Sequence, residues 1–469
     1  MPQNLRSRSS LRNTLIGDRA FYKMVLAILI PIIIQNAISN FVNLLDNIMV
    51  GQVGTEQMSG VAIVNQLMFV FNLCVFGGIS GAGIFSAQFH GANNQEGVRH
   101  CFRYKLYLCV VLVSVSALLF ITHGSGLIGL YLNGETDQAR AAVTLEHGTA
   151  YLRIMLLGLA PFALTQVYAS TLKETGETRL PMFAGVAAVC VNLVFNYLLI
   201  FGHLGFPQLG VAGAAVATVI SRFVELGIVL FFTHRGADRY RFIQGIYRSF
   251  RVPTDLVKQI TVKGLPLLVN EGLWSMGMAT LTQCYSVRGL DVVAAMNISS
   301  TISNLFAVAF LSMGVATSII VGQTLGANDM EGARTQAWRL IAFSIGLSLC
   351  TGVMLMLTAS LFPRIYQTTA DVRQLATSFL RIYACCMPLF SFANCAYFIL
   401  RSGGKTMLTF AFDSGYTWVV GVPIAWCLVH LTGMPVAAVY LCVQLADFIK
   451  CAFGFYLLRK GIWLNNMVG

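Results

Sequence analysis

The sequence predicts an all-α integral membrane protein with 12 transmembrane helices, arranged in two six-helix bundles related by a pseudo-twofold axis along the membrane normal. Three observations support this fold class. Of 469 residues, 56% are hydrophobic and 11% are charged, so one globular core could not bury the apolar surface. About twelve apolar stretches are long enough to span a bilayer. A nine-residue segment also occurs twice, about half a chain length apart.

The apolar stretches fall six in each half of the chain. A spanning helix needs about 20 mostly apolar residues, because the hydrocarbon core is roughly 30 Å thick. An even number of spans brings both halves into the membrane from the same side, so we expect a parallel repeat and not an inverted one. The predicted spans are residues 24–50, 58–86, 106–122, 147–170, 182–202, 211–233, 264–286, 293–321, 339–361, 377–400, 408–430 and 435–458.

The repeated segment marks the duplicated unit. Residues 91–99 and residues 326–334 share six of nine positions at an offset of 235 residues (326 − 91). Pro31 and Pro266 stand at the same offset (266 − 31) and open the first span of each half. The glycines of the repeated segment predict a tight loop that leads into a short polar helix.

Lysine and arginine residues predict that both termini are cytoplasmic. Cytoplasmic loops of membrane proteins are enriched in Lys and Arg. With the N-terminus inside, the loops and termini on the cytoplasmic side hold 23 such residues. The loops on the opposite side hold only four, Arg140, Arg288, Arg364 and Arg373.

The longest polar segment inside the chain joins the two halves. Residues 234–263 carry seven basic residues, which suits a cytoplasmic linker with a short helix on the anionic inner leaflet. We therefore predict an N-terminal bundle over residues 1–233, a linker over 234–263 and a C-terminal bundle over 264–469. The first apolar stretch is too long for a signal peptide, and we expect it to remain as a membrane anchor.

The first predicted span carries a polar stripe. At 100° per residue its polar side chains fall within an arc of about 140°. Interhelical hydrogen bonding is one explanation, but such contacts contribute only about 0.6 kcal/mol each. Seven polar residues exceed that need, so we interpret the stripe as the lining of a cavity that contains one carboxylate, Asp46. The stripe consists of Gln35, Asn36, Ser39, Asn40, Asn43, Asp46 and Asn47.

The corresponding span of the second half also carries a carboxylate. Asn270 and Glu271 are followed at helical spacing by Ser275, Met278 and Thr282. We predict that this face lines the same cavity. Glu271 lies about seven residues into its span, so a carboxylate that snorkels to the interface is the competing interpretation.

Further candidates are weaker. Asn192 and Asn196 share one face of the fifth span, and Thr218 in the sixth span could join them; packing and ion coordination are both compatible with this pattern. Pro31 and Pro266 can act as hinges, because each frees a backbone carbonyl, but such prolines also occur in static helices.

Two pairs of opposite charge lie one turn apart in predicted spans. Arg222 precedes Glu225 in the sixth span, and Asp447 precedes Lys450 in the twelfth. The spacing i, i+3 places each pair on one helix face. We expect both pairs to be structural.

Several function classes lack their motifs. The sequence contains no Gly-x-Ser-x-Gly, His-Glu-x-x-His or nucleotide-binding Gly-x-x-x-x-Gly-Lys-[Ser/Thr] motif. The twelve cysteines include no metal-type Cys-x-x-Cys pair. The basic residues follow the predicted topology, so we expect no nucleic-acid partner. These observations favour a transporter over an enzyme, without a cofactor apart from a coupling ion.

At four segments the sequence resembles the multidrug and toxic compound extrusion (MATE) family of transporters, in particular its bacterial NorM- and DinF-like members. The order and spacing of these segments are more specific than any one of them, and the resemblance covers essentially the whole chain. The segments are LDNIMVGQVG at 45–54, GETRLP at 176–181, VNLVFNYLLIFG at 191–202 and LGVAGAA at 209–215.

The resemblance implies two bundles around a central cleft that opens alternately inward and outward, and exchange of external Na⁺ or H⁺ for cytoplasmic drugs. It assigns cation coupling to Asp46, which is also the candidate Na⁺ ligand, and to Glu271. Some members place residues that assist the carboxylate of the N-terminal bundle at positions that match Asn192, Asn196 and Thr218.

Two departures from the family pattern bear on the ion. Asn196 stands where some members have a second aspartate, and residues 377–400 contain no carboxylate, although NorM-type proteins often have one there. A Na⁺ site with two carboxylates is therefore not expected in the C-terminal bundle. Burial of the lone Asp46 favours its neutral form, which favours H⁺, although one carboxylate among amide oxygens can also hold Na⁺.

The predicted function is secondary active efflux of small cationic drugs or toxins in exchange for H⁺ or Na⁺, by a monomer in the plasma (inner) membrane. Cation binding would neutralise Asp46 and lower the affinity of the cleft for drug. The alternative is a flippase for a lipid-linked precursor, which would favour several basic residues in the cleft. A membrane enzyme or receptor would need a catalytic cluster or soluble domain. The predicted cleft residues are Gln35, Asn36, Ser39, Asn43, Asn270, Ser275 and Met278.

Overall fold

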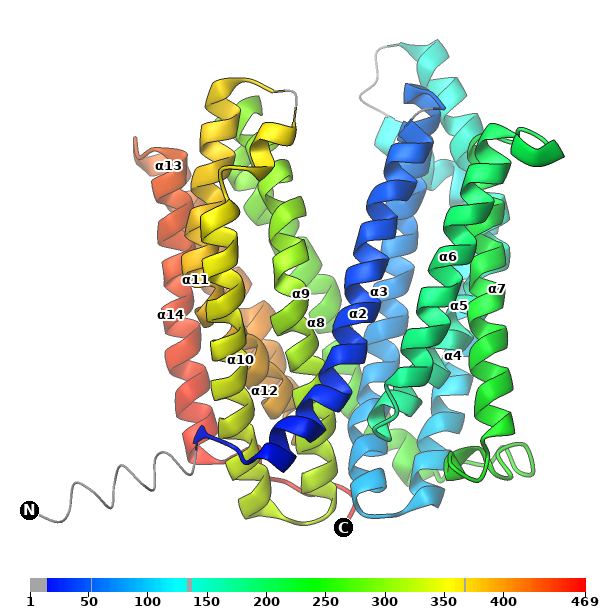
Figure 1. Ribbon diagram of the computed structural model, residues 1–469, viewed down its shortest axis with the longest axis vertical. Helices are drawn as coiled ribbons and strands as arrows, with labels where there is room; N and C mark the ends of the chain where they lie inside the picture. Colours follow the sequence, from blue (N-terminus) through cyan, green and yellow to red (C-terminus); the bar gives the residue numbers. More distant parts are fainter. Residues whose placement is uncertain (1–14, 52, 133–136, 367) are drawn as a thin grey trace, which may run out of the picture. The chain divides into compact units, whose positions relative to one another are not determined.

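The computed structural model describes residues 15–51, 53–132, 137–366 and 368–469, but not the side chains of residues 43, 44, 47, 48, 51 and 55. Long helices make up most of this part of the chain (Figure 1). The long helices are α2 (Arg19–Gly51), α3 (Thr55–Gly91), α4 (Gln95–Leu132), α5 (Gln138–Glu174), α6 (Arg179–Phe201), α7 (Val211–Arg235), α8 (Thr254–Ser286), α9 (Leu290–Gly326), α10 (Met330–Thr358), α11 (Ala370–Ser402) and α14 (Val436–Lys460).

One further span is built from shorter pieces. It begins with α12 (Thr406–Phe410), continues through the π-helical turns η4 (Ala411–Gly415) and η5 (Thr417–Gly421) and ends with α13 (Val422–Leu431). Pro423 follows the π-helical turns and lacks the N–H that would close a regular α-helical bond. Single π-helical turns inside helices frequently occur at functional sites. Short 3-10 turns follow α6, α7 and α10 at η1 (His203–Gly205), η2 (Arg241–Ile243) and η3 (Phe362–Ile365).

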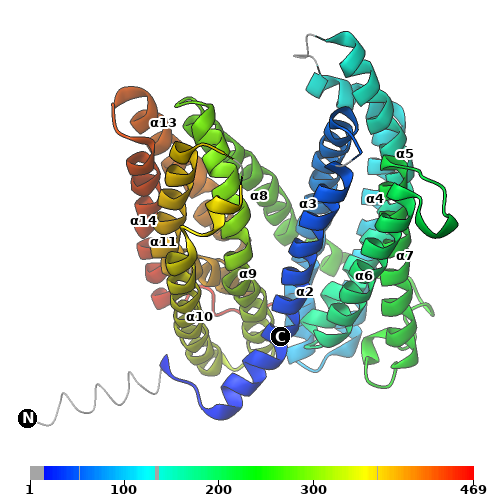
Figure 2. The same ribbon diagram turned by 45° about the horizontal axis from the view of Figure 1, so that its top comes forward.

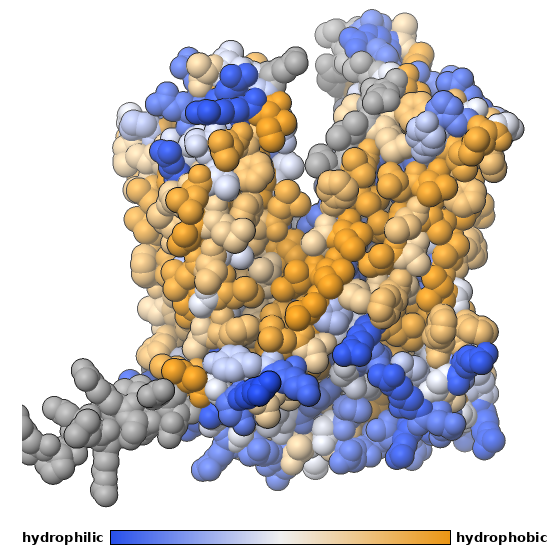
Figure 3. Space-filling view, viewed as in Figure 1, coloured by the Kyte–Doolittle hydropathy of each residue, from blue (hydrophilic) through white to orange (hydrophobic). Residues whose placement is uncertain are grey.

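The all-helical membrane fold predicted from the sequence is confirmed. Eleven spans among the described residues are long and apolar enough to cross a membrane. Helix α8 is not among the eleven, and it carries the polar pair Asn270 and Glu271 within its apolar stretch. With α8 the helices number twelve, as the sequence predicted. On the face drawn in Figure 3, apolar side chains cover the middle of the helices and hydrophilic side chains gather at their ends.

The lengths of equivalent helices follow the duplication. Helices α2 and α8 each have 33 residues, and α3 and α9 each have 37. Pro31 and Pro266 both lie inside their helices. They were expected to open these helices, but α2 and α8 begin twelve residues earlier, at Arg19 and Thr254 (31 − 19 and 266 − 254). The sequence missed these first turns because they are less apolar than the spans that follow.

The chain folds into two compact units. Unit 1 contains residues 1–33, 87–93 and 265–469, and unit 2 contains residues 34–86 and 94–264. In unit 1, α11 packs against α9, α10 and α14, and α9 packs against α10. In unit 2, α7 packs against α5 and α6, and α4 packs against α5 (Figure 2). The predicted bundle boundaries at residues 233 and 264 stay predictions.

The two copies of the repeated segment form equivalent turns. Asn93 and Asn328 both adopt a left-handed backbone conformation, with φ of 55° and 62°, which asparagine tolerates better than most residues. The next residue caps the following helix in each copy: Asn94 accepts from the Gly97 N–H, and Asp329 accepts from the Gly332 N–H. The following helices are the long α4 and α10, and not the short polar helices expected from the sequence.

Glycines in the repeated segment allow the C-terminal end of α3, residues 87–91, to approach α9 within unit 1. A Cβ atom on Gly91 would lie 1.8 Å from the carbonyl oxygen of Gln323, and one on Gly326 would lie 1.9 Å from that of Gln88. The contact is reciprocal. Gly91 meets Gln323, which lies three residues before Gly326 (326 − 323), and Gly326 meets Gln88, which lies three residues before Gly91 (91 − 88). The duplicated motif therefore joins its own two copies.

Candidate functional site

A polar cluster in unit 2 surrounds Asp46. Asn196 on α6 donates a hydrogen bond of 2.6 Å from Nδ2 to Asp46 Oδ1 on α2. Asn192 lies one turn earlier on α6, and its Oδ1 accepts from Asn196 Nδ2 at 3.1 Å. Thr218 on α7 lies 3.3 Å from the Asn192 amide nitrogen. The structure thus brings together four of the residues that were predicted for cation coupling, namely Asp46, Asn192, Asn196 and Thr218.

The Asn192 amide also faces Asp46. With its nitrogen toward the carboxylate, the amide donates to Asp46 Oδ2 at 2.9 Å and to Oδ1 at 3.1 Å. Hydrogen bonds of this kind stabilise the ionised form of a carboxylate.

The side-chain oxygen of Asn196 is a further feature of the cluster. Asn196 is 1% exposed, and its Oδ1 has no hydrogen-bond partner among the described residues. Buried polar atoms in proteins nearly always have a partner. Carboxylate, amide and hydroxyl oxygens are the ligands of hard cations, and the cluster supplies them from Asp46, Asn192, Asn196 and Thr218. These oxygen ligands fit a small hard cation such as Na⁺, or a water molecule that carries a proton.

A small cavity adjoins the cluster on the Thr218 side. It measures about 50 Å³ and is lined by Thr218, Arg222, Asn72 and several Met and Phe side chains. One water molecule needs roughly 10–15 Å³ of such volume, so the cavity has room for water but not for a drug. Arg222 pairs with Glu225 at 3.2 Å, as the sequence predicted, and stacks over the Phe162 ring.

A second polar cluster lies in unit 1 and centres on Asn270. Asn270 is 1% exposed, and its Oδ1 accepts from the Ser414 hydroxyl at 2.7 Å. Its Nδ2 donates to Asp413 Oδ2 at 3.1 Å and to the Tyr397 hydroxyl at 3.4 Å. Asp413 and Ser414 belong to the π-helical turn η4, so the wide turn presents its polar residues to α8.

Asp413 also forms an ion pair with Lys450 on α14, with 2.8 Å between Oδ1 and Nζ. Asp447, the partner of Lys450 expected from the sequence, is a charged neighbour of Lys450, but the direct ion pair is with Asp413. Asp413 was not among the charges predicted to matter within the spans. The available signal was an aspartate inside the apolar stretch 408–430.

Glu271 belongs to the same cluster. It hydrogen-bonds the Tyr397 side chain and has Arg401 and Asp413 as charged neighbours. Arg401 is itself 7% exposed. Asp447 is a further carboxylate beside Lys450. The cluster around Asn270, the C-lobe cluster, therefore places three carboxylates near two cationic side chains, Lys450 and Arg401. Asp46 instead accepts from the Asn196 amide.

The other predicted cleft residues are more scattered. Gln35 lies against Gly185 on α6, with its Nε2 3.0 Å from where a Cβ would stand. Asn36, Ser39 and Ser275 are half-buried, and Met278 is 44% exposed. The side chain of Asn43 lies outside the described residues.

Comparison with known proteins gives the same duplicated pattern. The model of the MatE family matches residues 31–198 and 266–427. Both matches begin at the repeat-related prolines.

Curated relatives match over most of their length. A probable multidrug resistance protein NorM from Thermotoga maritima is 25% identical over 87% of this chain and 85% of its own. A multidrug resistance protein MdtK from Pectobacterium atrosepticum is 25% identical over 86% of both chains.

Solved structures share the fold. An outward-facing multidrug resistance MATE family transporter of the MOP superfamily has a TM-score of 0.85 at 22% identity, over 95% of this chain and 96% of that one. A MATE protein in a bent conformation has a TM-score of 0.84 at 22% identity, over 95% of both chains. The family match covers well over half of the sequence, and the fold agrees with it. This chain therefore belongs to the MatE family and is a multi-pass membrane transporter, not an enzyme.

Proposed function

We propose that this chain exports small organic cations from the cytoplasm in exchange for H⁺ or Na⁺, as a multidrug efflux transporter of the plasma (inner) membrane. The observation that carries the proposal is the Asp46 cluster, in which the carboxylate accepts from the Asn196 amide, whose own buried oxygen has no hydrogen-bond partner among the described residues. The names of the NorM and MdtK relatives support multidrug resistance as the role. The excess of basic residues in alternate loops supports cytoplasmic termini.

Coupling follows from the two charge states of Asp46. In the ionised state, Asn196 donates to Asp46, and the negative charge attracts a cationic drug. When H⁺ or Na⁺ arrives from outside, it neutralises Asp46. The attraction for the drug is then lost. A ligand shifts a conformational equilibrium only by its differential affinity for the two states, and this charge change supplies the difference.

The cleft in this proposal is lined by Gln35, Asn36, Ser39, Asn43, Asn270, Ser275 and Met278. Asn270 enters the lining only when the Asp413 and Ser414 contacts loosen, because the structure holds it buried. Pro31 and Pro266 would act as hinges, since each removes a backbone hydrogen bond from a long helix. Glu271 would tune the C-lobe cluster and assist the coupling at Asp46.

A flippase for a lipid-linked precursor is the alternative function. An anionic headgroup would need unpaired basic residues near the cleft. Lys450 is paired with Asp413, and Arg401 has Glu271 as a charged neighbour. Because both basic residues of the C-lobe cluster have carboxylate neighbours, the cluster supports cationic cargo over anionic cargo.

The proposal is tested with the purified full chain in liposomes. An inward-directed gradient of H⁺ or of Na⁺, each in the absence of the other, should drive countertransport of the fluorescent cation ethidium. A matched assay follows a fluorescent lipid-linked anion under the same gradients. Ethidium movement that responds to one of the two gradients supports the proposal. Movement of the anion alone would establish the flippase, and ethidium movement that ignores both gradients would overturn ion coupling.

A further inference from the structure

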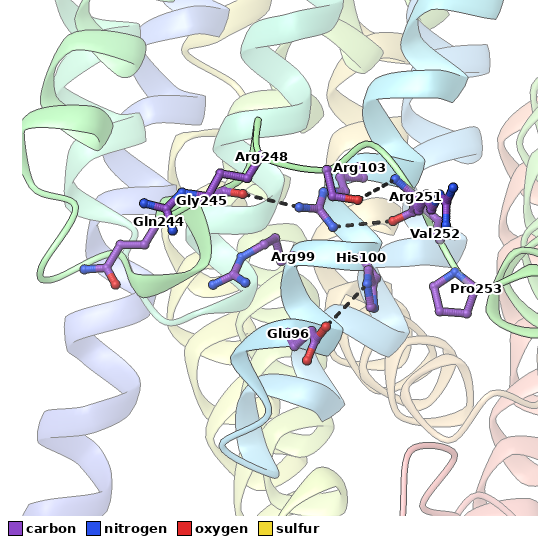
Figure 4. A pocket seen from close by; sticks show the side chains of 11 residues that line it. Glu96, Arg99, His100, Arg103, Gln244, Gly245, Arg248, Arg251, Val252 and Pro253 are labelled. Carbon is purple, nitrogen blue, oxygen red and sulfur yellow. Dashed lines mark hydrogen bonds and ion pairs between the residues drawn. The ribbon is translucent and has the colours of Figure 1, made fainter.

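A basic pocket opens at the end of unit 2 where α4 meets the segment after α7. It has a volume of about 950 Å³ and is lined by residues 96–103 of α4 and residues 244–253 (Figure 4). Four arginines and a histidine face one glutamate here: Arg99, Arg103, Arg248, Arg251 and His100 against Glu96. Counting the arginines and the glutamate, the net charge is +3 (4 − 1).

The pocket is built on two elements that hold each other. Arg103 is 6% exposed and donates to the Ile246 carbonyl at 3.1 Å and to the Gly245 and Arg251 carbonyls at 3.4 Å each. Arg99 donates to the Phe242 carbonyl at 3.4 Å. These bonds fix the backbone of the segment, and they leave the side chains of Arg248 and Arg251 at the exposed rim of the pocket.

The positive charge of the pocket is not neutralised by the protein. Glu96 lies 3.9 Å from His100, and within the described part of the chain Arg99, Arg248 and Arg251 form no ion pair with a carboxylate. Four guanidinium groups in one concavity repel each other, and an anion relieves that repulsion. Guanidinium groups bind phosphate oxygens with paired hydrogen bonds. A phosphate group is therefore the ligand chemistry that the pocket fits.

Aromatic side chains place the pocket near a membrane interface. Tyr107 follows Arg99 and Arg103 along the same face of α4 at intervals of four residues, and its hydroxyl donates to the Phe250 carbonyl at 2.5 Å. Tyr107 is 48% exposed and Phe250 is 57% exposed. Exposed aromatic side chains are typical of the headgroup level of a bilayer. Basic pockets on the cytoplasmic side of membrane helices bind anionic headgroups.

The charged residues of the pocket are not repeated in the sequence of the other half of the chain. The repeat offset of 235 relates Arg99 to Arg334, but it relates His100 to Thr335 and Arg103 to Trp338. The segment that supplies Arg248 and Arg251 occurs once. The charge cluster is therefore an addition to the duplicated scaffold and is not required by the fold.

We propose that this pocket binds a phosphate group, supplied by the headgroup of an anionic phospholipid such as phosphatidylglycerol or by a soluble phosphate ion. The inference is independent of the transported substrate and of the Asp46 cluster. It predicts that the charges of Arg248 and Arg251 strengthen phosphate binding, because their side chains make no backbone contact that holds the fold.

The test uses purified full-chain protein in neutral detergent at constant ionic strength, with Tm followed during titration. The probes are short-chain phosphatidylglycerol, phosphatidylcholine of the same chain length, and inorganic phosphate. A double variant, Arg248→Ala with Arg251→Ala, is compared with a control double variant, Arg334→Ala with Arg459→Ala. The control removes two exposed charges outside the pocket. Should the first pair lower the ligand-free Tm, the corresponding Arg→Gln pair gives the same comparison.

Two results would support the proposal and identify the source of the phosphate. Stabilisation by phosphatidylglycerol above phosphatidylcholine identifies a lipid headgroup, and stabilisation by inorganic phosphate alone identifies a soluble ligand. In either case the Arg248 and Arg251 pair should bind roughly 25-fold more weakly, since two charges contribute about 1 kcal/mol each and 1.4 kcal/mol is tenfold. Equal responses in the two variant pairs, or no response to either anionic probe, would overturn the proposal.

Discussion

Asn196 on α6 donates a 2.6 Å hydrogen bond to Asp46 on α2, across 150 residues of sequence. The contact joins two helices through the carboxylate on which the proposed coupling depends. Asn196 Nδ2 also reaches Asn192, and Asn196 Oδ1 has no hydrogen-bond partner among the described residues. The Asn196 amide thus stabilises the charge of Asp46, and in the proposed function its oxygen would contact the ion that neutralises that charge.

Replacing Asn196 should change the ion requirement of transport. In Asn196→Leu, Asp46 loses a hydrogen bond that favours its ionised form, and the cluster loses an oxygen. If Na⁺ is the coupling ion, its concentration for half-maximal transport should rise about tenfold, which is 1.4 kcal/mol. If H⁺ is the coupling ion, its concentration for half-maximal transport should fall instead, because the neutral carboxyl is favoured. Asn196→Asp adds a second carboxylate and should make transport more dependent on Na⁺. Dye efflux measured across a series of ion gradients checks both variants. Unchanged ion dependence in both would remove Asn196 from the coupling site.

The Asp413 and Lys450 pair should contribute to stability through its partial burial. The two side chains are 17% and 15% exposed, so Lys450→Met leaves a carboxylate largely shielded from water and should cost about 3 kcal/mol of unfolding free energy. The double variant Asp413→Asn with Lys450→Met should recover most of that loss. Thermal unfolding in detergent measures both.

The exposed pair of Arg140 and Glu56 provides the control. Its side chains are 54% and 31% exposed, and Arg140→Ala should change stability by less than about 1 kcal/mol. If Lys450→Met were as mild as Arg140→Ala, the buried pair would have no structural role. A double variant that is less stable than Lys450→Met would mean that Asp413 itself holds the π-helical turn.

The glycines of the repeated segment should tolerate no side chain. Gly91→Ala and Gly326→Ala each place a Cβ within 2 Å of a backbone carbonyl oxygen, so the helices α3 and α9 would have to separate. Gly126→Ala in α4 meets no atom within 4 Å, and alanine there should be neutral or stabilising by up to about 1 kcal/mol. Expression level and Tm of the three variants distinguish the cases. Normal Tm for Gly91→Ala and Gly326→Ala would show that the close approach is not needed.

The sequence predicted the scaffold well because membrane spans and the internal repeat are both local patterns. It also grouped Asp46, Asn192, Asn196 and Thr218, although for the last three the residues alone left packing equally open. The C-lobe cluster was harder, because the partner of Lys450 lies 37 residues away, on a different helix. Spacing along one helix favoured Asp447, and only the three-dimensional packing shows that Asp413 is the nearer charge.

The helix ends were also beyond the sequence patterns. Helices α2 and α8 begin five and ten residues before the predicted spans (24 − 19 and 264 − 254), in less apolar segments where hydropathy no longer distinguishes helix from loop. The basic pocket was hidden for a related reason. Its arginines were counted as topology signals, and their gathering into one concavity depends on how Arg103 holds the segment of residues 244–253.

The central claim is that Asp46 couples the ion to the drug, and Asp46→Asn tests it most directly. In liposomes that contain this variant, ethidium should no longer accumulate against its gradient when H⁺ or Na⁺ is supplied, while Glu146→Gln, which removes an exposed carboxylate of α5, should behave as the wild type. Loss of gradient-driven accumulation in a folded Asp46→Asn protein is the predicted result. Accumulation at the wild-type rate, with the usual dependence on the ion gradient, would contradict the account.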